Sequence, residues 1–166
     1  MGSLPKTVGN LLIAVVVCLF QFAAAPCSAL SHDTSAALAA ALKRLDAYYG
    51  DFADLAAAHI QDDMEFWIAT SCCSTTRTAF AYINSAKTLL ELHKVLSCSA
   101  DRTKSARIIR ETFRYYAKEL ELLANEAQKI GAHTNVPGLA LSAGKLRDEL
   151  RALVTVLEDT DFLAQH

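Results

Sequence analysis

An apolar stripe over residues 101–131 limits the folds open to this chain more than any other feature. Its members recur at alternating steps of three and four, which is the spacing of one face of an α-helix. They are Ala106, Ile109, Phe113, Tyr116, Leu120, Leu123, Ala127 and Ile130. A helix of about thirty residues is ~45 Å long, so it buries such a stripe only beside other long helices. Gly131, which follows the stripe, predicts a left-handed C-terminal cap there.

The rest of the chain offers three further stretches with helical periodicity. The first begins near residue 33, and its apolar face comprises Leu38, Leu42 (or Ala41), Leu45, Tyr48, Phe52, Leu55 and His59. This face keeps its phase across Gly50, so one helix is expected to run on toward Phe66 and Trp67. The small polar run 70–76 predicts the first break, because Ser and Thr are poor helix formers.

A second helix then extends from about residue 75 to about residue 97, where the long helix follows. After a connection that contains Asn135, Pro137 and Gly138, the last helix carries Leu146, Leu150, Leu153, Val154 and Leu157. The composition agrees with helices, since 52% of the residues are hydrophobic and Gly and Pro number only 6 and 3. Four helices with three short connections predict an all-α, antiparallel up-down-up-down four-helix bundle.

The first 29 residues predict the compartment. Lys6 is followed by an apolar run at 11–20 and by small residues up to Ala29, which is the pattern of a secretory signal peptide. We therefore expect a signal peptide at 1–29, a bundle domain at 30–166, and an exported protein, periplasmic or extracellular, that meets the membrane only transiently. The alternatives are an uncleaved anchor, although the run is shorter than the ~20 residues of a spanning helix, and lipid attachment at Cys27, which Pro26 disfavours.

Charge is segregated along the chain. Residues 33–65 contain seven acids and two bases, whereas residues 77–118 contain nine bases and three acids. Arg107, Arg110, Arg114 and Lys118, here called the basic strip, share one face of the predicted long helix, opposite its apolar stripe. The strip is either a solvated face, worth a few tenths of a kcal/mol per ion pair, or a docking surface for an anionic partner. Without residues 1–29 the net charge is −3, which argues against nucleic acid as the partner.

Three cysteines remain after residue 29, namely Cys72, Cys73 and Cys98, an odd number for an oxidising compartment. If 75–97 is one helix, Cys73 and Cys98 lie roughly 35 Å apart, well beyond the ~7 Å between the Cα atoms of a disulfide. A turn at Asn84–Ser85 would instead bring Cys72 beside Cys98, but its signal is weaker than that of 70–76. A Cys72–Cys73 bond, a cross-link to another chain and pairing across the bundle stay open.

Candidate chemistry is sparse. His59 and Asp63, four residues apart, are the best pair for a metal on one helix face, and His93 is expected at a different depth of the bundle. The sequence lacks the Glu-x-x-His of di-iron bundles, the Cys-x-x-Cys-His of attached haem and the Gly-x-Ser-x-Gly of hydrolases. We therefore predict a protein that is not an enzyme and needs no cofactor.

Two functions fit these observations. The first is an exported interaction protein that binds a partner protein, or associates with itself, through the basic strip. The alternative is a bundle that holds a metal, a haem or a small apolar ligand in its interior near His59.

Overall fold

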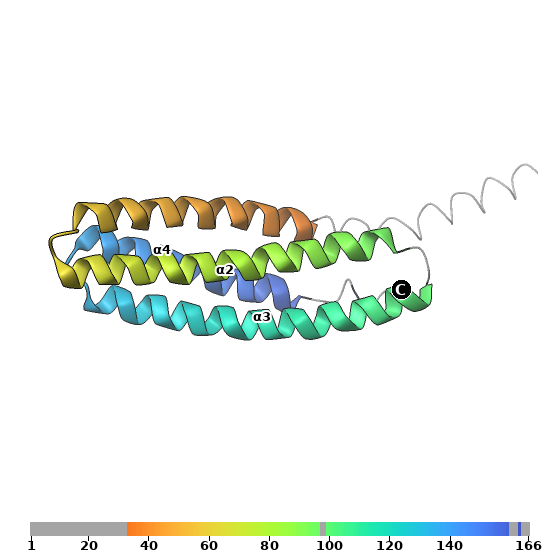
Figure 1. Cartoon of the computed structure of the whole chain (residues 1–166). Coiled ribbons are helices and arrows are strands. Elements are labelled where there is room, and N and C mark those ends of the chain that lie inside the picture. Colours follow the sequence, from red (N-terminus) through yellow and green to blue (C-terminus); the bar gives the residue numbers. More distant parts are fainter. Residues whose placement is uncertain (1–32, 97–98, 160–162, 164–166) are drawn as a thin grey trace, which may run out of the picture.

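The computed structural model describes residues 33–96, 99–159 and 163, and the predicted signal peptide and its cleavage site lie outside this part of the chain. An N-terminal helix covers residues 33–58, followed by α2 (Asp63–Val95), α3 (Ser99–His133) and α4 (Pro137–Glu158). The helices lie side by side and alternate in direction (Figure 1). For the described residues, the prediction of an all-α chain with four helices is confirmed. Among the described helices, none is both long and apolar enough to cross a membrane.

The first break in the chain lies at residues 59–62, so the predicted break at 70–76 is wrong. The backbone N–H of Asp62 donates to the carbonyl of His59 (2.9 Å), and the Asp62 carboxylate accepts from the N–H of Glu65 (3.3 Å). Asp62 is thus the N-cap of α2, and Asp63 and Glu65 place negative charge in its first turn. Both features favour a helix start at this point.

Residues 70–76 instead lie inside α2. The Thr76 hydroxyl donates to the carbonyl of Cys72 (2.7 Å), and the Thr78 hydroxyl donates to that of Ser74 (3.0 Å). These bonds satisfy the polar side chains within the helix, and Cys72, Thr75 and Thr76 are buried. The alternative turn at 84–85 is also wrong, because those residues lie in the middle of α2.

Gly131 does not end α3, which continues to His133, and no described glycine has a positive φ. The predicted left-handed cap is therefore wrong. A Cβ placed on Gly131 would lie 3.2 Å from the Cβ of Ala143, so this glycine marks a close approach of α3 and α4. Gly50, by contrast, has no neighbour within 4 Å of such a Cβ. The N-terminal helix passes through Gly50 without a break, as predicted.

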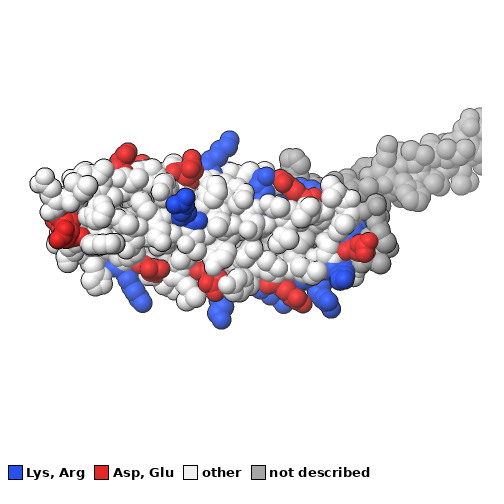
Figure 2. Space-filling model, in the orientation of Figure 1, with Lys and Arg blue, Asp and Glu red and all other residues white. Residues whose placement is uncertain are grey.

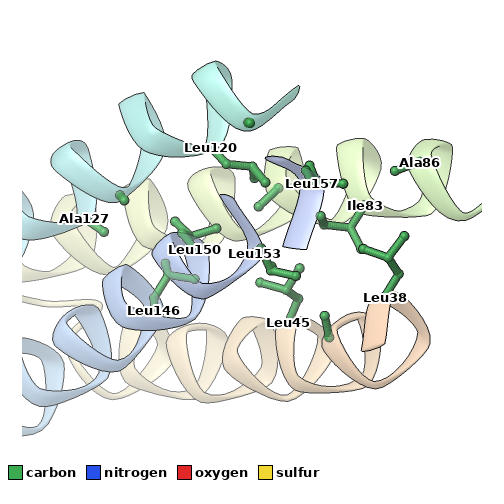
Figure 3. Close-up of a cluster of buried hydrophobic side chains, with 14 of the residues drawn as sticks. Leu38, Leu45, Ile83, Ala86, Leu120, Ala127, Leu146, Leu150, Leu153 and Leu157 are labelled. Atoms are coloured by element: carbon green, nitrogen blue, oxygen red, sulfur yellow. The ribbon is translucent and has the colours of Figure 1, made fainter. Parts of the chain in front are cut away.

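The core combines leucines of α4 with leucines, phenylalanines, isoleucines and alanines of its neighbours. Leu146, Leu150, Leu153 and Leu157 of α4 point inward toward Leu38, Leu45 and Ile83, with Leu120 and Ala127 of α3 beside them (Figure 3). The stripe residues Ala106, Ile109, Phe113, Leu120 and Ala127 are buried, as predicted, together with Ala117 and Ala124. Tyr116, Leu123 and Ile130 lie at the edge of the core. Alanines opposite leucines let the helices approach closely and still fill the interior.

A buried carboxylate fixes the connection between α3 and α4. Glu65, in the first turn of α2, is only 4% exposed. Its side chain accepts hydrogen bonds from the Thr134 hydroxyl (2.5 Å) and from the N–H of Asn135 (2.9 Å). The Thr134 hydroxyl oxygen in turn accepts from the N–H of Val136 (3.1 Å). One side chain therefore joins the start of α2 to the residues that precede α4.

Candidate functional site

The basic strip lies on the flank of α3 that faces α4. Arg107, Arg114 and Lys118 are exposed and Arg110 is half-buried. Arg110 follows the buried Ile109 by one residue, and Lys118 follows Ala117 in the same way, so each is rotated by about 100° from the core. The strip thus borders the apolar stripe. The prediction from the sequence, that the strip lies opposite the apolar stripe, is wrong.

None of the four strip cations forms an ion pair with a described residue. The ion pairs in this part of the chain are Arg44–Glu149, Lys87–Glu91, Arg147–Asp148 and Arg151–Glu121. Between Arg102 and Lys118 the sequence has six cations and one acid, Glu111. The N-terminal half of α3 therefore carries positive charge that the neighbouring helices do not neutralise. Along the α3 edge of the face in Figure 2, acidic side chains accompany the basic ones.

Two hollows border the strip. The one near its C-terminal end, about 500 Å³, is lined by Arg114, Ala117, Lys118, Glu121, Leu122, Val154 and Glu158. The one near its N-terminal end, about 430 Å³, is lined by His93, Arg102, Thr103, Ala106, Arg107, Arg110 and Leu163. Two carboxylates balance the cations of the first hollow, whereas the described residues that line the second include three arginines and no acid. We call the second the arginine hollow.

Sequence reasoning overlooked Arg102, although a signal was present. Arg102 precedes Ala106 by four residues and so occupies the next position of the apolar stripe, where a leucine would be expected. Its side chain is half-buried, and its Nε atom is buried without a hydrogen-bond partner among the described residues. The pattern of polar and apolar residues in the sequence is enough to show that a charged residue occupies a stripe position.

His59 and His93 lie near opposite ends of α2. The N-terminal helix ends at residue 58, so the half-buried His59 lies in the turn and the exposed Asp63 begins α2. The prediction that this pair shares one helix face is wrong. His93, near the other end of α2, contacts Ser105 of α3 through Nδ1 (2.6 Å). Within the described ranges, no group of three or more His, Cys, Asp or Glu side chains is placed to hold a metal ion.

Of the disulfide candidates, Cys72 is buried and Cys73 half-buried, both are free cysteines in the structure, and Cys98 lies outside the described residues. Burial raises the pKa of the Cys72 thiol to about 12, and Cys73 and Glu126 add smaller contributions. Burial also raises the pKa of Cys73. Thiols with raised pKa values react slowly near neutral pH, because the thiolate is the nucleophile.

No protein-family model, no curated protein and no solved structure matches this chain.

Proposed function

We propose that this chain is an exported, non-enzymatic binding protein, and that the basic strip of α3 docks an anionic partner protein. Export rests on the sequence of residues 1–29. The observation that best supports the docking role is that the four strip cations have one acid, Glu111, among them and form no ion pair with a described residue. A partner with carboxylates at matching positions would supply the missing counter-charges.

The arrangement is unfavourable for the isolated chain, which strengthens this interpretation. Members of the strip are spaced three or four residues apart along α3, so like charges are neighbours on the helix surface. Each such like-charge pair costs a few tenths of a kcal/mol. An anionic partner would relieve this repulsion on binding.

The alternative of a ligand inside the bundle receives less support. His59, the residue proposed to hold such a ligand, lies in the turn after the N-terminal helix and not among the buried positions. The described positions of the hydrophobic core are occupied by Leu, Ala, Ile and Phe side chains and by Cys72, which pack against one another.

An acidic polypeptide tests the docking role directly. Binding of fluorescein-labelled poly-glutamate to the purified chain is measured by fluorescence anisotropy at low and high salt. We expect binding that weakens with salt and that falls at least tenfold in the double variant Arg110→Glu plus Arg114→Glu. The matched control is Lys129→Glu plus Lys145→Glu, which changes the net charge equally at exposed lysines outside the strip. Equal loss in both double variants, or no loss in the first, would contradict the proposal.

A further inference from the structure

The arginine hollow exists because α3 extends past the end of α4. The two helices have 35 and 22 residues and are joined through residues 134–136. The first turns of α3 therefore lie beyond the last turn of α4, as the projecting α2–α3 end in Figure 1 shows. Arg102 belongs to these first turns. Its stripe position faces the side where α4 would have continued.

The lining of the hollow has the chemistry of an anion site. Among the described residues, three arginines and no carboxylate contribute to it. Arginine presents a planar fork of N–H donors that matches the oxygens of phosphate and sulfate and pairs with them in a bidentate manner. The Nε of Arg102 is buried and has no acceptor among the described residues. A buried N–H donor is normally satisfied, but here no hydrogen bond from Nε to a described residue fixes the guanidinium group of Arg102.

The hollow also has room for more than a bare ion. Its volume of about 430 Å³ lies within the range of about 300–1,000 Å³ typical of small-molecule sites. Ala106 and Leu163 provide an apolar part of its wall. His93 enters the lining from α2 and is positioned by its contact with Ser105. The N-terminal end of the α3 dipole adds to the positive potential.

From this combination we propose that the arginine hollow binds a small molecule through a phosphate or sulfate group. The positive charge of three guanidinium groups around one hollow is more than a single carboxylate can neutralise. A doubly charged tetrahedral anion matches this charge more closely. The guanidinium groups of Arg102, Arg107 and Arg110 line the hollow and bind the oxygens of this anion. The hollow shares Arg107 and Arg110 with the basic strip. Arg102, which is not part of the strip, distinguishes the small-anion site from the docking surface.

The test compares phosphate, sulfate and chloride at equal ionic strength, with the unfolding temperature of the purified chain as the readout. We expect phosphate and sulfate to raise this temperature by several degrees over chloride. Arg102→Leu, which restores an apolar residue to the stripe, should weaken phosphate binding at least tenfold in calorimetric titration. The control Lys104→Leu removes an exposed cation two residues away and should leave the phosphate response unchanged. A response to phosphate no larger than to chloride, or the same loss in both variants, would overturn the proposal.

Two further measurements separate this proposal from the docking role of the strip. Arg102→Leu should leave poly-glutamate binding intact, whereas Arg114→Glu should weaken poly-glutamate binding and leave the phosphate response intact. If Arg114→Glu removes the phosphate response as fully as Arg102→Leu does, the protein senses only diffuse charge and the hollow is not a site. Should Arg102→Leu fail to fold, the Arg102 Nε–H resonance of the unmodified chain serves instead. It should shift on addition of phosphate and not of chloride, and an unmoved resonance would refute the proposal.

Discussion

Replacing Glu65 with alanine should destabilise the fold more than any other substitution of a single carboxylate among the described residues. The Glu65 side chain is 4% exposed and accepts from the Thr134 hydroxyl and from the N–H of Asn135, which belong to the connection before α4. Its place in the first turn of α2 also stabilises the negative charge through the helix dipole. The alanine variant removes the acceptor and leaves two partly buried donors without a partner.

The expected loss follows from these two bonds. A hydrogen bond to a charged group contributes about 1.5–3 kcal/mol, and an unsatisfied buried donor costs about 1–3 kcal/mol. Because Thr134 can rotate its hydroxyl toward solvent, we expect a total loss near the lower end, about 3 kcal/mol. For a chain of this size each kcal/mol lowers the unfolding temperature by about 2–4 °C. The variant should therefore unfold about 10 °C below the parent chain.

Urea denaturation followed by circular dichroism measures this free energy. Glu111→Ala is the matched control, since Glu111 is exposed and makes no hydrogen bond with a described residue, and it should change stability by less than about 0.5 kcal/mol. Thr134→Val should cost less than Glu65→Ala, and the double variant should cost less than the sum of the two, because both act on one network. A Glu65→Ala loss below about 1 kcal/mol would refute the assignment of Glu65 as the group that holds the connection.

Two further predictions concern the glycines and the buried thiol. Gly50→Ala should stabilise the chain by about 0.5–1 kcal/mol in thermal unfolding, because nothing lies within 4 Å of the new Cβ; Gly144→Ala, equally open, is the control within α4. Gly131→Ala should stabilise the chain less than Gly50→Ala, or destabilise it, because the new Cβ would lie 3.2 Å from the Cβ of Ala143. An equal gain from Gly50→Ala and Gly131→Ala would contradict the close packing of α3 and α4. For Cys72, the folded pKa of about 12 lies above the unfolded value of about 9, so the unfolded chain loses the proton first and stability falls with rising pH between these values. The Cys72 thiol should make the free energy of unfolding fall by up to about 1.4 kcal/mol per pH unit in this range. Cys72→Ala should remove this contribution in urea denaturation series at pH 9, 10 and 11. The same pH dependence in parent and variant would show that Cys72 ionises as readily in the folded as in the unfolded chain.

Pattern reasoning succeeded where burial alone decides a residue's environment. The α3 stripe and the leucines of α4 are correct because a period of three and four admits one way of turning an apolar face inward. It failed at the start of α2. The apolar period continues through residues 59–62, so the pattern predicted one continuous helix there. It gave too little weight to Asp62 as the cap of a new helix. The charge of the basic strip was readable from the sequence, but its position beside α4 was not, because that depends on which neighbour covers which flank of α3.

The sequence by itself determined that the chain forms long helices with leucine-rich and alanine-rich faces, since both the period and the residue sizes are local properties. Only the tertiary structure decided that residues 70–76 continue α2 and that Cys72, Thr75 and Thr76 are buried there, because small side chains at these positions depend on neighbouring helices to cover them. It alone decided that Gly131 serves packing and not termination. It also decided that Arg102 lies beside a hollow, because the relative lengths of α3 and α4 determine which stripe positions α4 leaves uncovered.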